Sequence, residues 1–407
     1  MDFDDTPEEA AWRTRVRGYL TEHRQQLGHR SAGSGRNDVP AAKRSQACLY
    51  DGGFIGVTWP TEFGGQSGTP MQQAIVDQET ARAAVPAPIN MIGIGMCGPT
   101  VIAHGSEDQK QRYLTRLLRA DDIWCQLFSE PASGSDLAAL RTKAVRTEDV
   151  DWRITGQKVW TTGAHYADYG ILLTRTNPEV PKHKGLTMFV VDMRAPGVTV
   201  RPLRQMSGGS DFNEVFFDEV VIPDSERLGE VDNGWRVALT TLMSERLSLG
   251  GGGTDIGMGV DALVAHAAQH ITTLSTDRQA LARQDLGRAY VASLGIRYTG
   301  YRLLSAISRG EAPGPEASAG KLAGTVAARA MADLAVRLLG DEAVYATTSD
   351  GSATWQHLQA VLPGMAIAGG TDQILKNVLG ERVLGLPTEP RADKGAPVRP
   401  TSTGGQS

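Results

Sequence analysis

The stretch WRITGQKVW at residues 152–160 opens the β-rich middle of this 407-residue chain. Short runs rich in β-branched and aromatic residues follow it at 171–175, 186–192, 198–203 and 215–222, separated by turn residues. Because helical periodicity is lacking between these runs, the pattern predicts an antiparallel sheet or barrel rather than a doubly wound parallel sheet. We therefore expect a middle β domain over residues 122–231.

Helical patterns flank this β region on both sides. Thr6 can cap a helix that starts at Pro7, and further helix signals lie at 70–84 and 107–118. Helical periodicity returns at Gly234 and continues to about residue 382. The expected fold class is α+β, with an N-terminal helical domain at 1–121, the middle domain and a C-terminal helical domain at 232–387. The tail, 388–407, is rich in Pro, Gly, Ser and Thr, which predicts mobility.

Composition and charge narrow the possible partners and the compartment. The chain has 41 basic and 46 acidic residues and no long run of one sign, so nucleic acid and anionic membranes are poor partners. The three cysteines are too few and too far apart for a disulfide framework or a CxxC zinc site. The uncharged stretch at 83–103 contains three prolines and three glycines, so we expect no membrane span. These features predict a cytoplasmic protein.

Two motif-like patterns carry little weight. Residues 93–98 match GxGxxG, but they follow no strand and lie in no βαβ unit, which argues against dinucleotide binding. His266 and His270 are four residues apart on an expected helix, a spacing that can hold zinc. A third ligand is not evident, so we expect two surface histidines and no metal site.

Two segments of the β region suit a polar ligand. Residues 124–136 combine hydroxyls, a proline-bounded turn and Gly134-Ser135, which can present amides to an anion or to the edge of a ring. The alternative is an ordinary exit from a strand. Residues 156–165 place Trp160 and Thr162 before a glycine turn, where an indole can cover a flat ring and a hydroxyl can bond its edge. Here the alternative is a core tryptophan.

A third segment, the helix around residues 243–249, offers a base. Its heptad-like face contains Trp235, Ala238, Leu242, Glu245 and Leu249. A carboxyl group on such a face loses water, and its pKa then rises towards the range that suits a general base. A structural ion pair is the alternative for Glu245.

Taken together, these motifs resemble those of the acyl-CoA dehydrogenase family. The matching runs are Phe-Ser-Glu-Pro-x-x-Gly-Ser-Asp at 128–136, Gly-Gln-Lys-x-Trp-x-Thr at 156–162, and Gly-Thr-Asp-Gln-Ile at 370–374, followed by Leu-Gly-Leu-Pro at 384–387. The likeness extends from about residue 3 to 387. It implies N-terminal helices, a middle antiparallel β-barrel and a C-terminal four-helix bundle. It also implies an FAD-dependent enzyme of lipid metabolism, such as fatty acid β-oxidation.

The resemblance assigns roles to individual positions. By this likeness FAD binds between the barrel and the C-terminal helices, where Trp160 covers the ring and Thr162 bonds its polar edge. The positions implied along the flavin and the pantetheine are Phe128, Ser129, Gly134 and Ser135, of which Ser135 also meets the substrate, and Thr371 and Gln373 meet the cofactor.

The family reaction needs a base that removes an α-proton from an acyl-CoA thioester while hydride leaves the β-carbon for flavin N5. Many members carry this base directly before the last Gly-Thr, where this chain has Gly369. A subset resembling isovaleryl-CoA and long-chain dehydrogenases takes it from a Glu-Arg pair, which Glu245 and Arg246 match. The resemblance therefore implies Glu245 as base and Arg246 at the thioester region. The amide of Gly369 can still donate to the thioester oxygen.

Two departures from the family pattern affect cofactor and partner. The Arg-x-x-Phe-Gly loop is not recognisable near 274–284, and the Gln-x-x-Gly-Gly run appears as RLLGD at 337–341. The far end of FAD must then be held differently. These changes resemble an actinobacterial branch, some members of which form heterotetramers with a related subunit and act on bulky esters such as sterol side chains.

The expected partners are an acyl-CoA, an electron-transfer flavoprotein, and either further copies in a homodimer or homotetramer or a related subunit. Three alternatives stay open on the same scaffold: an oxidase reoxidised by oxygen, a dehydrogenase of carrier-bound acyl groups, and a non-catalytic subunit of a heterotetramer.

Overall fold

The structure is a computed structural model that describes residues 4–29, 38–250, 259–311, 314–345 and 353–390, with the side chains of 246–250, 345 and 353 left out. The expected mobile tail falls almost wholly outside these residues. The chain forms two compact units. The first contains residues up to Ile89, the short stretch Met206–Gly209 and Glu245–Pro387, and the second contains Asn90–Gln205, Ser210–Ser244 and the residues after Pro387. The predicted domain boundaries stay a prediction.

The N-terminal helices of the first unit start where their capping signals stand. They are α1 (Pro7–Glu22), α2 (Arg24–Leu27), α3 (Val39–Asp51) and α4 (Pro70–Arg82), with a 3-10 turn at Thr61–Phe63. Thr6 accepts a hydrogen bond from the amide of Glu9, and the Glu9 carboxylate accepts one from the amide of Thr6 at 2.8 Å. This capping box confirms the predicted helix start.

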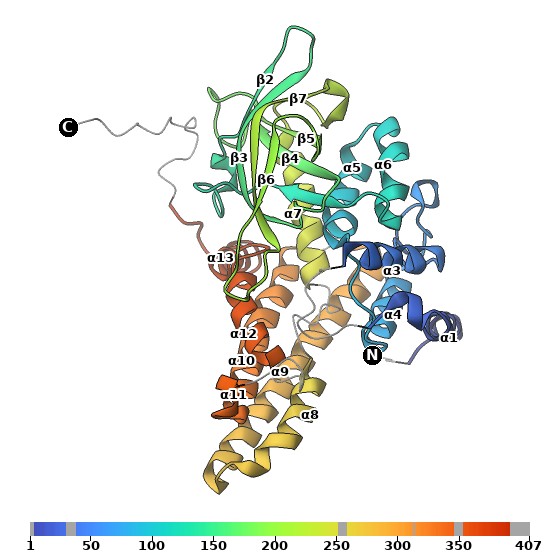
Figure 1. The fold of residues 1–407 in the computed structure, drawn as a ribbon, viewed down its shortest axis with the longest axis vertical. Coiled ribbons are helices and arrows are strands. Elements are labelled where there is room, and N and C mark those ends of the chain that lie inside the picture. Colours follow the sequence, from blue (N-terminus) through green and yellow to red (C-terminus); the bar gives the residue numbers. More distant parts are fainter. Residues whose placement is uncertain (1–3, 30–37, 251–258, 312–313, 346–352, 391–407) are drawn as a thin grey trace, which may run out of the picture. The chain divides into compact units, whose positions relative to one another are not determined.

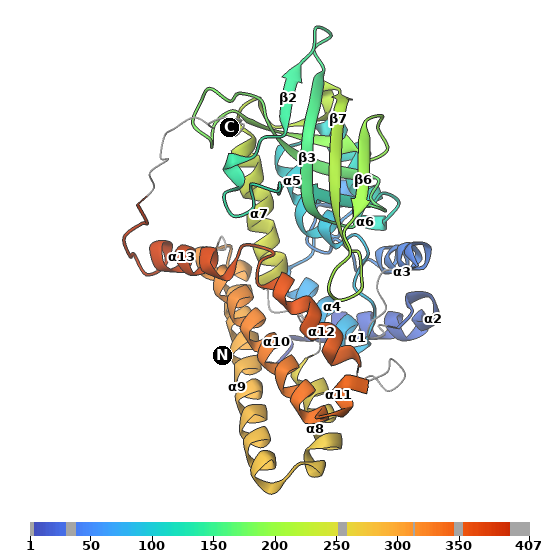
Figure 2. The same cartoon turned by 60° about the vertical axis from the view of Figure 1, so that its left-hand side comes forward.

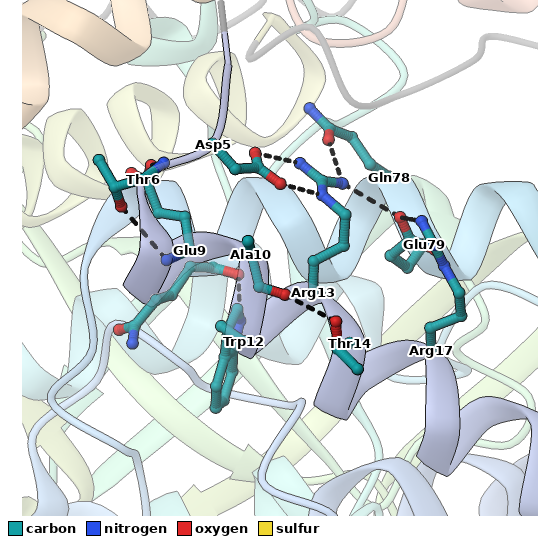
Figure 3. A network of polar contacts seen from close by, with 11 residues as sticks. Asp5, Thr6, Glu9, Ala10, Trp12, Arg13, Thr14, Arg17, Gln78 and Glu79 are labelled. Carbon is teal, nitrogen blue, oxygen red and sulfur yellow. Dashed lines mark hydrogen bonds and ion pairs between the residues drawn. The ribbon is translucent and has the colours of Figure 1, made fainter.

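A buried carboxylate joins α1 to α4 (Figure 3). Glu79 of α4 is 4% exposed and accepts from Arg13 Nη1 at 3.1 Å and from Arg17 Nε at 2.9 Å. Arg13 also bonds Asp5, with Nε 2.6 Å from Oδ2. The hydrogen bond from Arg17, aided by the one from Arg13, lowers the pKa of Glu79 against the opposing effect of burial. The carboxylate is thus matched by two guanidinium groups.

The C-terminal helices of the first unit pack around α10 (Figure 1). They are α8 (Val260–His270), α9 (Thr276–Ser308), α10 (Ser318–Leu339), α11 (Glu342–Tyr345), α12 (Ala353–Met365) and α13 (Asp372–Arg382), with 3-10 turns at Ile271–Thr273 and Pro315–Ala317. Before them in the chain comes α7 (Gly234–Gly250), whose residues up to Ser244 belong to the second unit. Helices α8, α9 and α12 contact α10 and share one apolar core with it. The expected helical bundle is confirmed.

One expectation in this bundle is wrong. His266 is 9% exposed, and its Nε2 lies 3.0 Å from the carbonyl oxygen of Ala335. It therefore belongs to the core between α8 and α10, although His270 beside it is only half-buried. The four-residue spacing shows that His266 and His270 lie on one face of α8. It does not show that α10 covers part of this face.

The second unit combines α5, α6 and the part of α7 up to Ser244 with a mixed sheet (Figure 2), which has eight strands. Its elements are a π-helical turn (Gly93–Cys97), α5 (Gly98–His104), α6 (Glu107–Arg119), a 3-10 turn (Leu137–Ala139), β1 (Trp124–Leu127), β2 (Lys143–Arg146), β3 (Trp152–Thr162), β4 (Tyr169–Arg175), β5 (Leu186–Asp192), β6 (Val198–Pro202), β7 (Phe212–Ile222), a 3-10 turn (Asp224–Glu226) and β8 (Arg227–Leu228). The strand order is β6-β7-β3-β2-β4-β5-β8, and β1 pairs with β4.

The predicted strands are confirmed, and so is the largely antiparallel sheet. Within the part of the sheet that the structure describes, β1 and β2 instead run parallel to β4. The two long strands β3 and β7 pair antiparallel, with register shifts before Gly156 and after Lys158. The core packs Trp152, Phe189 and Phe217 with smaller residues of the same sheet. The second shift lies inside the predicted ligand segment at 156–165.

A buried ion pair fastens β3 to the loop that follows β1. Lys158 of β3 is fully buried, and its Nζ donates to Glu130 Oε1 at 2.9 Å and to the carbonyl of Phe128 at 3.0 Å. The Glu130 carboxylate also accepts from the amides of Arg141 and Thr142 at 2.7 and 2.8 Å. Burial lowers the pKa of Lys158 to about 8 against the opposing effect of Glu130. Burial alone would raise the pKa of Glu130, but the Lys158 charge and these hydrogen bonds lower it.

The Glu79 network predicts an acid-dependent loss of stability. Replacing Glu79 by Gln should cost roughly 1.5–3 kcal/mol at neutral pH, because charge-assisted hydrogen bonds to two arginines are lost. The folded-state pKa of Glu79 lies below its ordinary value of 4.5, so the benefit is complete above that value. It should fade as the pH falls through the lowered pKa. Urea unfolding across this pH range should show the wild type and E79Q converging in acid; a constant difference would contradict this account.

The Lys158 pair predicts a larger effect on stability. Replacing Lys158 by Met leaves Glu130 buried without its counter-charge, at a cost of about 3–5 kcal/mol in unfolding free energy. Lys182 is the matched control, since it pairs with Asp136 of the same loop at 2.8 Å but that carboxylate is 55% exposed. K182M should cost under about 1 kcal/mol. Urea unfolding followed by tryptophan fluorescence compares the two, and equal losses would show that burial does not decide the strength of the Lys158 pair.

Candidate active site

The predicted ligand loop at 128–136 lies directly after β1. Phe128 is 4% exposed and Ser129 is half-buried, with its carbonyl accepting from the amide of Val159 at 2.9 Å. Glu130 and Ser133 exchange backbone hydrogen bonds of 3.1 and 3.0 Å, which closes a tight turn. Gly134 and Ser135 follow this turn on the exposed side. The loop therefore has a fixed base and an accessible tip.

Trp160 is not the core tryptophan of the alternative interpretation. Its side chain is 61% exposed, although it lies on a central strand. Its φ is 60°, in the left-handed region that non-glycine residues rarely adopt. The register shift between Lys158 and Thr161 contains it, and its ring meets the edge of Phe212 with centroids 6.1 Å apart. Such local strain with an exposed aromatic face is a feature of ligand sites.

Two hydroxyls accompany this indole. Thr162 is half-buried at the end of β3, opposite Phe212 of β7. The Oγ1 of Thr161 is buried and has no hydrogen-bond partner among the described residues. The exposed indole, these hydroxyls and the accessible Gly134-Ser135 tip fit a flat conjugated ring with polar substituents, as FAD has.

In the first unit, Glu245 occupies the predicted helix face. Helix α7 buries Ala238 and Thr241 at earlier turns of the same face, and Glu245 itself is half-buried. The start of the helix is held within the second unit, where Thr241 Oγ1 lies 2.8 Å from Thr100 Oγ1. The side chain of Arg246 lies outside the described residues, so its predicted contact stays a prediction. Helix α7 thus has a buried contact in the second unit, before the residue that starts the next segment of the first unit, Glu245.

The last motif forms a turn between α12 and α13. Gly369 and Gly370 have φ values of 67° and 90°, which only glycine adopts without strain. Thr371 is the N-cap of α13 and accepts from the amide of Ile374 at 3.1 Å. Gln373 is exposed on the first turn of α13. The Thr371 hydroxyl therefore caps the N-terminus of α13. Its predicted contact with the cofactor stays a prediction.

Sequence reasoning missed a buried lysine beside this turn. Lys321 of α10 is 2% exposed, and its Nζ donates to the carbonyl of Gly370 at 2.9 Å. Its second neighbour is Asp372, with Oδ1 at 3.5 Å. Burial lowers the pKa of Lys321, while the charges of Asp372 and Glu245 oppose this shift. A sequence signal existed, since Ser318, Lys321 and Thr325 recur along one face of an alanine-rich helix.

Within the described ranges, no group of three or more His, Cys, Asp or Glu residues is arranged to hold a metal ion. None of the helices in those ranges combines the length and hydropathy needed to cross a bilayer.

Comparisons with known proteins identify the family of this chain. The family models for acyl-CoA dehydrogenases match three successive parts of the chain: the N-terminal domain at 6–121, the middle domain at 125–220 and the C-terminal domain at 232–384. A solved structure, the "Tcur3481-Tcur3483 steroid ACAD", superimposes with a TM-score of 0.81 at 28% identity, covering 96% of this chain and 100% of that one.

Two curated relatives from Mycobacterium tuberculosis also match. Acyl-CoA dehydrogenase FadE34 is 40% identical over 86% of this chain and 47% of its own length, so the chain spans about half of that relative. Acyl-CoA dehydrogenase IpdE1 is 33% identical over 93% of this chain and 98% of its own length. The chain therefore belongs to the acyl-CoA dehydrogenase family, whose members are flavoprotein oxidoreductases.

Proposed function

We propose that this protein introduces an α,β double bond into an acyl-CoA thioester, with Glu245 as the catalytic base. The observation that carries this proposal is the half-buried Glu245 carboxylate on α7, together with the glycine at position 369. At that position the chain offers a backbone amide rather than a carboxylate. The acid–base work therefore falls to α7.

The chain's own groups have distinct tasks in this reaction. Glu245 removes the α-proton and keeps it on its carboxyl group, and Ser135 and Arg246 bind the substrate. The amide of Gly369 donates to the thioester oxygen as negative charge develops there, a contribution of about 3 kcal/mol when well aimed. FAD, when bound, supplies the acceptor for the hydride that leaves the β-carbon.

Residues of both motif loops are proposed to hold FAD. Trp160 covers one face of the ring and Thr162 bonds its polar edge, which the exposed indole and the half-buried hydroxyl support. The other proposed contacts are Phe128, Ser129, Gly134, Ser135, Thr371 and Gln373. Because Phe128 is buried, its contribution is its backbone and the placement of Ser129.

The proposed substrate class and partner subunit rest on the family resemblance and on the name of the similar solved structure. The name of that protein, Tcur3481-Tcur3483 steroid ACAD, joins two components and specifies a steroid, which supports a bulky, steroid-like acyl group and a related second subunit for this chain. We propose an electron-transfer flavoprotein as the electron acceptor. A homo-oligomer is the alternative to the heteromer, and the cytoplasmic location stays a prediction.

Replacing Glu245 by Gln tests the proposed base. In wild-type protein an acyl-CoA added without oxygen should bleach the flavin band, and E245Q should bind flavin normally but bleach roughly 10³-fold more slowly, because its amide cannot take the proton. Straight, branched and steroid-like acyl-CoAs should be compared, since the responsive class identifies the substrate. Glu342, exposed on α11, is the matched control, and E342Q should behave as wild type. Normal bleaching by E245Q would exclude this residue as the base.

Flavin content tests the proposed partner. The chain expressed alone should purify with little FAD, and co-expression with a related acyl-CoA dehydrogenase subunit should raise the FAD content of the purified complex. Size-exclusion chromatography with light scattering gives the assembly mass. A lone chain that is fully loaded with FAD as a homo-oligomer would contradict the heteromeric proposal and leave the base assignment intact.

A further inference from the structure

We propose that Asn213 is a positioning residue that holds the backbone from Trp160 to Thr162 in the shape that receives the flavin ring. The inference rests on the proposed contacts of Trp160 and Thr162 with FAD. Asn213 lies on β7, the strand next to theirs, and is fully buried. It therefore acts on the ring site through the backbone of β3.

The feature that Asn213 supports is a β-bulge in β3. Lys158 pairs with Val215 of β7, and Thr161 pairs with Asn213. Because three steps along β3 match two steps along β7, β3 contains one extra residue here. Trp160 lies in this bulge with a φ of 60° and an exposed side chain. A residue with a Cβ keeps such a conformation only where the surrounding structure holds it, so the bulge needs an anchor.

The side-chain amide of Asn213 supplies this anchor. Its Nδ2 donates to the carbonyl of Thr161 at 2.9 Å and to the carbonyl of Asp211 at 3.1 Å. Its Oδ1 lies 3.1 Å from Nδ1 of His165, in the loop that follows β3. One buried side chain thus joins the residue after the bulge, the start of β7 and the loop after Thr162.

The two carbonyl groups determine how the amide is oriented. Both hydrogens of the Asn213 amide bond to carbonyl oxygens, and exchanging its nitrogen and oxygen would bring three oxygens together without a hydrogen. The amide oxygen therefore faces His165, and Nδ1 of His165 carries the hydrogen of that bond. Since a free neutral imidazole favours the hydrogen on Nε2, the tautomer of the exposed His165 is a signature of this network that needs no cofactor.

The backbone on which Asn213 stands is firm. Strand β7 lies between β3 and β6, and Asn213 is paired on both sides. The residue before it, Phe212, pairs with Thr162, and its ring meets the Trp160 indole with centroids 6.1 Å apart. Loss of the Asn213 amide should therefore release the Thr161 carbonyl and the bulge while the sheet itself persists.

Replacing Asn213 by Ala tests this role. Without the anchor, Trp160 and Thr162 are no longer held ready for the ring, so the Kd for FAD should rise about tenfold or more. FAD is titrated into the apoprotein, in the assembly in which the wild type binds it, and the change in flavin fluorescence gives the Kd. In ¹⁵N NMR of protein labelled in its histidine rings, the neutral His165 ring should shift from Nδ1–H towards Nε2–H in N213A. The His165 signals are assigned by their loss in H165Q.

Asn90 is the matched control for Asn213. It is also fully buried in the second unit, and its Nδ2 donates to the carbonyls of Leu117 and Asp122 at 2.9 and 3.0 Å. Its Oδ1 accepts from the amide of Trp124 at 2.8 Å. Because the hydrogen bonds are alike, N90A should lower the urea midpoint about as much as N213A. It should leave the Kd for FAD and the His165 tautomer unchanged.

Three results would overturn the proposal. The first is a Kd for FAD that N213A leaves unchanged. The second is a Kd that N90A raises as much as N213A, as a general loss of stability would give. The third is a wild-type His165 with its hydrogen on Nε2.

A second variant covers the case in which N213A does not fold. In N213S one hydroxyl donor replaces the two amide hydrogens, so the Kd for FAD should rise about threefold, and an unchanged Kd would again overturn the proposal. A wild-type protein that binds no FAD in any assembly would refute the proposed function itself. Normal binding that N213A does not weaken would refute only the role of Asn213.

Discussion

The site in the second unit depends on one constraint: a charge inside the sheet must be neutralised. Lys158 is fully buried on β3, and it forms an ion pair with Glu130, which lies in a loop 28 residues earlier in the chain. Since Lys158 also holds the Phe128 carbonyl, the loop after β1 cannot move away from β3. The register of β3 shifts directly after this lysine, and the shifted segment contains Trp160, whose side chain is exposed. The anchored loop and the exposed indole thus lie on either side of the same buried ion pair in the sequence of β3 and its partner loop.

The first unit also contains a buried lysine, Lys321, but its charge is compensated differently from that of Lys158. Glu130 matches Lys158 at 2.9 Å, and two backbone amides complete the carboxylate shell, so that pair is nearly self-contained. Among the residues that the structure describes, Lys321 donates to the neutral Gly370 carbonyl at 2.9 Å, and its carboxylate neighbour, Asp372, is 3.5 Å away. An ion pair in close contact has little field left at a distance, whereas a looser one still acts on nearby groups. The charge of Lys158 is thus more completely compensated by its partners than the charge of Lys321.

Local signals in the sequence predicted most of the elements. The helix start after Thr6 follows from its capping residues, and β5 begins and ends at the residues expected from its apolar run. What failed depends on distant contacts. The parallel alignment of β1 with β4 joins residues about 45 positions apart, and His266 is buried because α10 covers it. The left-handed Trp160 also lacks a local signal, since only the pairing of β3 with β7 places the register shift there. The roles of Trp160, Thr162 and Glu245 stay predictions.

The backbone at Gly369 explains why a base can reside on α7 instead. With φ at 67°, this position suits glycine, and any carboxylate-bearing residue there would have to adopt a left-handed conformation at a cost of roughly 1 kcal/mol. A glycine at the turn removes that strain and still offers its amide. The proposed base, Glu245, instead lies on a helix, where its backbone has the ordinary right-handed conformation. In this proposal the proton acceptor and the amide donor come from two separate segments of the chain, so neither has to compromise the backbone geometry of the other.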